Sequence, residues 1–71
     1  MAGVLVIGAG KAGTAVARSA LDGGHQVRMI EVRPEHVEEG VERLPGVAVH
    51  HGSGTDPSDL EAAGIRLCHV V

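Results

Sequence analysis

The sequence contains no Trp, Tyr or Phe, so any hydrophobic core must be built from aliphatic side chains and methionine. Proteins that bind single-stranded nucleic acids without sequence preference stack the bases on aromatic rings, and this chain has none. Basic residues are also few, since six Lys and Arg stand against nine Asp and Glu for a net charge of -3. We therefore expect no nucleic-acid partner.

A single cysteine, Cys68, cannot form a disulfide within the chain, which argues against a secreted domain held together by disulfides. No apolar run approaches the roughly 20 residues of a membrane-spanning helix. No basic stretch precedes the first apolar run, so the N-terminus does not read as a signal peptide. With 71 residues, 44% of them hydrophobic, we expect one small globular domain over residues 1–71, located in the cytoplasm.

Glycine is abundant, with 11 residues, and separates short apolar runs from segments with helical periodicity. This pattern predicts strands over 4–7, 27–32, 47–50 and 67–71, and helices over 11–21, 34–44 and 57–63. Strands that alternate with helices imply a parallel sheet with right-handed crossovers. We predict an α/β fold: a Rossmann-like half domain with a sheet of about four strands in the order 3-2-1-4 and three helices.

The helical periodicity also indicates which side chains face the core. Asp56 is the expected N-cap of the third helix and Pro57 its first residue, with Asp59 a second acid at the helix start. Met29 and Cys68 are expected in the core. The inward-facing helical positions are Ala12, Ala15, Val16, Ser19 and Ala20, then Val37, Val41 and Leu44, then Leu60 and Ala63.

Residues 8–13 read Gly-Ala-Gly-Lys-Ala-Gly, a G-x-G-x-x-G motif that follows a predicted buried strand and opens a helix. In a dinucleotide-binding turn each glycine has a separate use. Gly8 permits the tight turn, Gly10 lets the backbone approach a diphosphate, and Gly13 allows close packing of helix on strand. The helix N-terminus would offer its free N–H groups and partial positive charge to the phosphates.

An acidic residue is expected about 20 residues further on, at the end of the second strand. Glu31 lies there, eighteen residues after Gly13. Its carboxylate could accept hydrogen bonds from both ribose hydroxyls and would repel a 2′-phosphate, which favours NAD or another adenine nucleotide over NADP. Arg33 tempers this preference, because a nearby arginine can accommodate a 2′-phosphate.

The five histidines do not indicate a metal site. His50 and His51 are adjacent in a predicted strand and therefore point to opposite faces, and no Cys/His spacing of a zinc site is present. His25 and His36 are expected on the surface. We predict no metal, and the absence of a recognisable nucleophile–base arrangement predicts no catalytic residues.

The glycine turn, Glu31 and the segment Gly-Ser-Gly-Thr-Asp-Pro-Ser-Asp-Leu-Glu-Ala-Ala-Gly-Ile over 52–65 together resemble the regulator-of-potassium-conductance (RCK, or KTN) domain of the TrkA N-terminal type. The likeness covers essentially the whole chain but only the first half of the family's domain. It implies a non-catalytic module that binds NAD(H) or ATP, ADP or AMP and regulates a potassium channel or transporter. Such a module is cytoplasmic or peripheral at the inner membrane through its transporter partner.

The resemblance also implies a set of ligand-binding residues. Ser53 stands where the family commonly has Asp, so a hydroxyl that can donate or accept a hydrogen bond replaces an acid near the adenine. Lys11 matches a position where some members have an arginine near the outer phosphates. The implied cofactor-binding residues are Gly8, Ala9, Gly10, Lys11, Ala12, Gly13, Glu31, Val32, Arg33, Ser53, Gly54 and Thr55.

Two other readings stay open. The glycine motif and Glu31 alone would equally fit the cofactor-binding half of an NAD-dependent oxidoreductase. An apolar strand end at Val70 and Val71 would also invite strand pairing between two copies, which predicts a homodimer.

Overall fold

The computed structural model describes residues 3–71, with only the backbone of Leu67 included. Strands and helices alternate along the chain, and none of the helices within 3–71 is long and apolar enough to cross a membrane. The elements are β1 (Gly3–Ile7), α1 (Lys11–Asp22), β2 (Gln26–Glu31), α2 (Pro34–Arg43), β3 (Ala48–His51), α3 (Pro57–Ala62), the short 3-10 helix η1 (Ile65–Leu67) and β4 (His69–Val70).

The four strands form one parallel sheet in the order β3-β2-β1-β4, as predicted. In the register, Ile7 of β1 lies beside Ile30 of β2, and Glu31 of β2 lies beside His51 of β3. Because all strands run the same way, their carboxyl ends meet at one edge of the sheet. The α/β Rossmann-like half-domain fold is confirmed.

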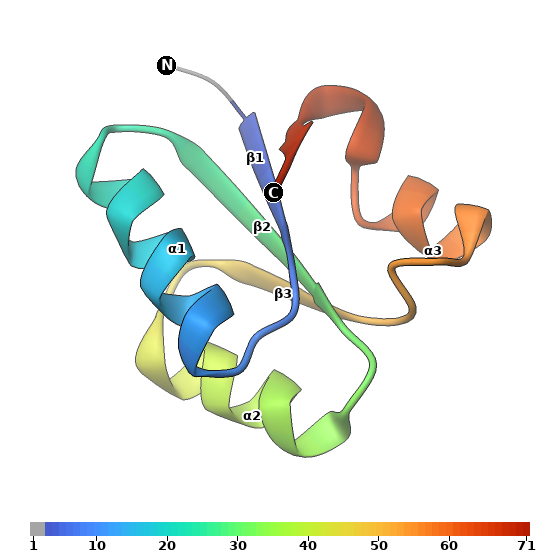
Figure 1. Ribbon diagram of the computed structural model, residues 1–71, viewed down its shortest axis with the longest axis horizontal. Coiled ribbons are helices and arrows are strands. Elements are labelled where there is room, and N and C mark those ends of the chain that lie inside the picture. Colours follow the sequence, from blue (N-terminus) through green and yellow to red (C-terminus); the bar gives the residue numbers. More distant parts are fainter. Residues whose placement is uncertain (1–2) are drawn as a thin grey trace.

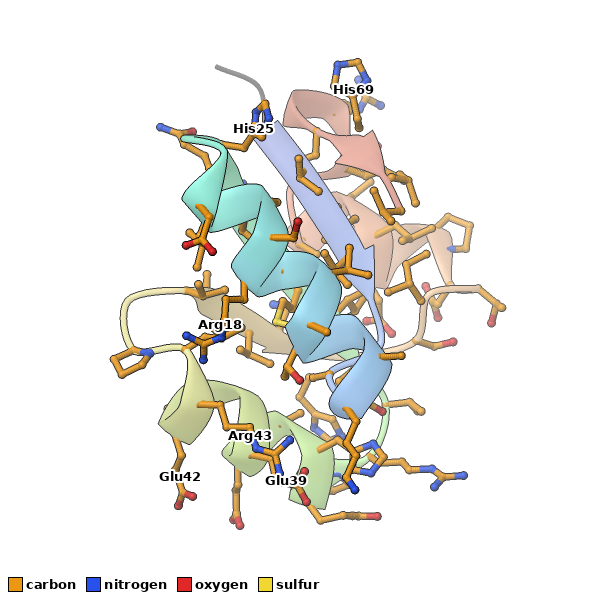
Figure 2. The ribbon with its side chains drawn as sticks, turned by 60° about the vertical axis from the view of Figure 1, so that its left-hand side comes forward. Arg18, His25, Glu39, Glu42, Arg43 and His69 are labelled. Carbon is orange, nitrogen blue, oxygen red and sulfur yellow. The ribbon has the colours of Figure 1, made fainter. Side chains whose placement is uncertain are left out.

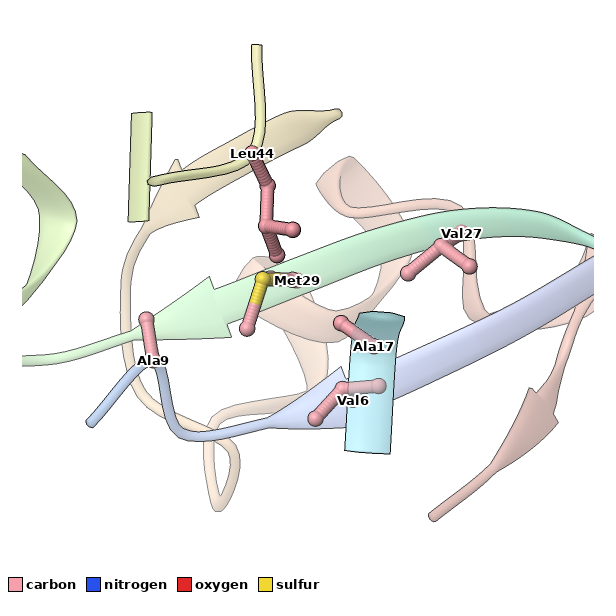
Figure 3. Packing of buried hydrophobic residues seen from close by; sticks show 6 residues of the cluster. All are labelled: Val6, Ala9, Ala17, Val27, Met29 and Leu44. Carbon is pink, nitrogen blue, oxygen red and sulfur yellow. The ribbon is translucent and has the colours of Figure 1, made fainter. Parts of the chain in front are cut away.

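Helices cover both faces of this sheet, with α1 and α2 on one side and α3 on the other (Figure 1). Side chains alternate along β1, so that Val6 packs under α1 and α2 while Leu5 faces α3 and η1. On the side of the sheet covered by α1 and α2, the core is a cluster of Val6, Ala9, Ala17, Val27, Met29 and Leu44 (Figure 3). The second face consists of Leu5, Ile30 and Ala63, with Leu60, Ile65 and Cys68 partly buried against them.

The predicted inner face of α1 is wrong. Thr14 and Ala17 are buried, whereas four of the five expected positions are exposed and Ala20 is partly buried. The hydroxyl of Thr14 lies 2.9 Å from the Gly10 carbonyl oxygen and 3.0 Å from that of Lys11, so it donates to its own helix. This bond removes the cost of burying a polar group. The exposed positions are Ala12, Ala15, Val16 and Ser19.

The predicted face of α2 also needs one correction. Leu44 is buried and Val37 partly buried, but Val41 is 53% exposed and Gly40 takes its place against the sheet. A Cβ at Gly40 would lie 3.2 Å from Val49 Cγ2 and 3.3 Å from Ala9 Cβ. The missing side chain therefore lets α2 approach the sheet more closely than a count of apolar residues predicts.

The last predicted strand is shorter than expected. Residues 67–71 were predicted to be extended, but η1 occupies Ile65–Leu67 and β4 is only His69–Val70. Pairing with β1 continues through the backbone, since Val71 N–H donates to the Leu5 carbonyl at 2.9 Å. The other strand and helix predictions agree with the structure to within a residue or two, and Met29 is fully buried as expected.

Candidate functional site

Three chain segments meet at the carboxyl edge of the sheet. They are the turn after β1, the end of β2 with the residues that follow it, and the loop after β3. Between them is an open cleft of about 400 Å³. In doubly wound sheets, this edge is where ligands bind. The lining residues are Ile7, Gly8, Ile30, Glu31, Val32, Gly52, Ser53, Gly54 and Thr55.

Two glycines of the turn after β1 are required by the fold itself. Gly8 has a φ of +102°, in the left-handed region that other residues rarely adopt, and its N–H donates to the Ile30 carbonyl at 2.8 Å. A Cβ at Gly13 would collide with the Gly8 carbonyl oxygen. Gly13 therefore allows α1 to pack directly on the turn, as the sequence predicted.

The fold does not require a glycine at position 10. Gly10 has ordinary extended torsions, with φ −74° and ψ −164°. A Cβ there would meet only the ring of His36, at 3.6 Å and 3.7 Å, which is ordinary van der Waals contact. Gly10 is also the N-cap of α1 and brings no side chain that could bond the first helical amides. The N-terminus of α1 therefore has no capping side chain.

The remaining residues of the turn separate into buried and exposed ones. Ala9 is fully buried in the core beneath the turn, and Ala12 is exposed. Lys11 does not line the cleft. It lies instead in a second hollow of about 390 Å³ that is also lined by Arg18 of α1 and Arg43 of α2, both labelled in Figure 2.

Glu31 is the last residue of β2 and is only 7% exposed. Its Oε1 accepts a hydrogen bond from the Ala9 amide and its Oε2 one from the Arg33 amide, each at 2.8 Å. Burial raises the pKa of the Glu31 carboxyl, but these two bonds and the neighbouring His36 outweigh burial, so the pKa lies below its usual value. Glu31 is therefore an anion that ties the glycine turn to β2 and borders the cleft.

The residues after Glu31 lie at the surface. Val32 is 60% exposed and forms an apolar wall of the cleft. Arg33 is exposed and is the N-cap of α2, with its amide held by Glu31. Arg33 is not among the residues that line the cleft.

The loop after β3 is held by side chains of the loop and of α3. The Ser53 amide donates to Asp59 Oδ2 at 2.8 Å, and the Ser53 and Thr55 hydroxyl oxygens are 2.8 Å apart. A Cβ at Gly52 would lie 2.8 Å from Asp59 Cγ, and one at Gly54 would lie 2.7 Å from Ile7 Cγ2. Both glycines therefore serve the packing of this loop on α3 and β1.

Comparison with known proteins fits this geometry. The family model of the TrkA-N domain matches residues 4–71. The chain belongs to the TrkA-N domain family. TrkA-N domains are Rossmann-type nucleotide-binding domains, which agrees with the class of ligand that the glycine motif predicts.

Two relatives of this TrkA-N domain are described as Trk system potassium uptake protein TrkA homologs, one from Pyrococcus abyssi (strain GE5 / Orsay) and one from Pyrococcus horikoshii (strain OT-3). Each is 38% identical over 63 residues, 89% of this chain. The chain spans 27% of the length of either protein. A probable 3-hydroxybutyryl-CoA dehydrogenase from Bacillus subtilis (strain 168) is 46% identical over 41 residues, 58% of this chain and 14% of that protein.

Sequence reasoning missed three residues of the TrkA-N domain at this edge. Ile7 has a 46% exposed side chain that lines the cleft, although the run it ends was predicted to be buried. His36 was expected on the surface but has its Nδ1 3.4 Å from Glu31 Oε1. Asp59 was expected only to start a helix but also holds Ser53. The available signal for His36 was its place in the first turn of a helix that begins just after Glu31.

Asp56 has the predicted role. Its Oδ1 accepts hydrogen bonds from the Ser58 amide at 2.8 Å and from the Asp59 amide at 3.3 Å, as an N-cap does. Within residues 3–71 no three His, Cys, Asp or Glu side chains are grouped closely enough to hold a metal ion.

Proposed function

We propose that this TrkA-N domain binds an adenine nucleotide in the cleft at the carboxyl edge of its sheet. The observation that carries the proposal is made at Gly10: the fold does not need a glycine there, yet the residue leaves the N-terminus of α1 without a capping side chain. Helix N-termini attract phosphate through their free amides and partial positive charge. A glycine that the fold does not need is therefore explained by a phosphate group that approaches from outside.

The other parts of the nucleotide would lie across the cleft from this helix end. Glu31, ionised and next to the turn, would accept hydrogen bonds from the ribose hydroxyls, because its two oxygens keep unused lone pairs after bonding Ala9 and Arg33. Ile7 and Val32 would provide apolar walls for the base, beside Ser53, Gly54 and Thr55. The negative charge of Glu31 favours NAD(H), ATP, ADP or AMP over NADP.

The bound nucleotide would serve as a regulatory ligand and would not take part in a chemical reaction. The Pyrococcus relatives are named as potassium uptake proteins, so we propose a regulatory role in a potassium transport system, in the cytoplasm or at the inner membrane through the transporter. The nucleotide would shift the assembly between two states by an amount set by the difference in its affinity for them.

We further propose a homodimer formed at the sheet edge, where His69 and Val70 of β4 are exposed. Light scattering over a concentration series tests it, and a constant monomer mass would contradict it.

A second candidate is the cofactor-binding half of an NAD-dependent oxidoreductase. The match to the Bacillus subtilis dehydrogenase supports it. The family match over 4–71 favours the regulatory function, because it includes the loop at 52–55 and α3 as well as the glycine turn. The surrounding reading frame discriminates between the two: a substrate domain would support the oxidoreductase, and a second TrkA-type lobe the regulator.

The direct test is calorimetric titration of the chain with NAD, NADH, ATP, ADP and AMP. We expect at least one to bind. Gly10→Ala should weaken that ligand and Gly10→Val abolish its binding, while both variants stay folded with a loss of about 1 kcal/mol in stability, because Ala and Val are poorer N-cap residues than Gly. Ala48→Val, on an exposed strand position away from the cleft, is the matched control and should bind as the parent does. Parent-like affinity in Gly10→Val would place the ligand elsewhere.

A further inference from the structure

His36 stands beside the space that we propose for the phosphates. It is the third residue of α2, and its side chain is 30% exposed. Nδ1 lies 3.4 Å from Glu31 Oε1, and the same ring edge lies 3.6–3.7 Å from the position that a Cβ would take at Gly10. The imidazole therefore borders both the ribose-binding carboxylate and the phosphate-binding turn of the proposed site.

We propose that His36 is a ligand-contacting residue of this site, which in its protonated form donates a hydrogen bond to a phosphate oxygen of the bound nucleotide. The inference rests on the proposed function. Neither the glycine motif nor the acid at the end of β2 calls for a histidine here. In this chain the histidine would supply a positive charge that depends on pH, because imidazole changes its charge between about pH 5 and pH 8.

The charged groups around His36 determine the sign of the effect. Glu31 faces the ring from β2, Lys11 begins the helix that follows the turn, and Glu35 and Glu39 are its neighbours on α2. Glu31 already accepts two backbone hydrogen bonds, so its charge is stabilised by groups other than His36 as well. A diphosphate beside Gly10 would add negative charge near the ring, so it would interact more favourably with the protonated ring than with the neutral one. Binding would then take up protons, and affinity would rise as pH falls.

A purely structural His36 would behave differently. If the ring served only as a partner of Glu31, removing it would lower stability but leave the pH dependence of nucleotide affinity unchanged. The pH dependence therefore separates ligand contact from structural support. NAD is the suitable probe, because its diphosphate carries no proton that titrates near neutral pH.

The experiment measures the affinity for NAD of the parent, His36→Gln and His51→Gln at about pH 6 and about pH 8. His51 is the matched control: it lies at the same edge of the sheet, but its Nε2 is 3.0 Å from the Val32 carbonyl oxygen and, unlike His36, its ring does not lie within 4 Å of the position of a Cβ at Gly10. We expect the parent and His51→Gln to bind about three- to tenfold more tightly at the lower pH, and His36→Gln to lose this gain.

A second measurement on the unmodified protein protects the test against a variant that folds poorly. Titration in two buffers of different ionisation enthalpy gives the number of protons taken up on binding, and we expect a positive fraction of one. NAD binding with no proton uptake, or an unchanged pH gain in His36→Gln, would overturn the role of His36 and leave the proposed function standing. Absence of NAD binding at either pH, with ATP, ADP and AMP equally inactive, would overturn both.

Discussion

The two glycine-containing loops at the carboxyl edge of the sheet use their glycines differently. In the loop at 52–55, a Cβ on Gly52 would collide with Asp59 and one on Gly54 with Ile7. Both positions therefore need a glycine because of neighbouring side chains within the chain. In the turn at 8–13, Gly13 does the same and Gly8 is required by its left-handed φ, but Gly10 has ordinary torsions and a Cβ there would meet only the His36 ring at ordinary van der Waals distance. The comparison separates the glycines that serve the fold from Gly10, the one that we propose serves a ligand.

Each loop is also held by one carboxylate from another part of the chain. Glu31 Oε1 accepts from the Ala9 amide in the first loop, and Asp59 Oδ2 from the Ser53 amide in the second, both at 2.8 Å. Glu31 is buried and borders the cleft, whereas the bond made by Asp59 is only part-buried and joins the loop to its own helix α3. The first loop is therefore tied to the site and the second to the adjoining helix.

The largest effect is expected for Gly13→Ala. The added methyl would overlap the Gly8 carbonyl oxygen, which belongs to the backbone and cannot rotate away, so α1 must move off the turn. We expect a loss of about 3 kcal/mol in the free energy of unfolding. Urea denaturation followed by far-ultraviolet circular dichroism measures it. If Gly13→Ala were as stable as the parent, the fold would not require a glycine at position 13.

A smaller effect is expected for Glu31→Gln, which tests the tie to the first loop. One of the two backbone amides loses its acceptor, at a cost of about 2 kcal/mol near neutral pH. Because the folded pKa of Glu31 lies below its unfolded value, its contribution is present above the unfolded value and is lost as pH falls through the folded one. Unfolding free energies measured at falling pH should therefore converge between parent and variant. A constant difference would contradict the ionised role of Glu31.

The smallest loss is expected for Gly54→Ala. Its methyl would meet Ile7 Cγ2, which belongs to a side chain and not to the backbone, and Ile7 is 46% exposed and therefore has room to shift. We expect a loss of about 1 kcal/mol in the free energy of unfolding, measured as for Gly13→Ala. A loss as large as that of Gly13→Ala would show that the second loop is as rigid as the first.

Much of the fold could be predicted from the sequence. The apolar run before Gly8 and the alternation of strands and helices indicate a parallel sheet, and the glycine motif fixes where the first helix must begin. Glu31 could be placed at the end of β2 because its spacing from Gly13 is that of a βαβ unit. These features depend on residues close together in the sequence and on the backbone geometry that such residues favour, so they can be predicted without knowledge of distant contacts.

The rest depends on contacts between distant side chains. Thr14 is buried because its hydroxyl finds acceptors in its own helix, and Gly40 is buried because Val49 and Ala9 lie close by. Counting apolar residues misses both, since a threonine counts as polar and a glycine as neutral. The approach of His36 to Glu31 follows from the way in which α2 packs on the sheet, which periodicity alone does not fix.

The two loops share one support. The Gly8 amide donates to the carbonyl of Ile30 and the Gly52 amide to the carbonyl of Glu31, so consecutive peptide groups at the end of β2 hold the turn after β1 and the loop after β3. The groups that border the cleft are thereby ordered when the chain folds. A nucleotide that bridged them would meet a preorganised surface, and little further conformational entropy would be lost on binding.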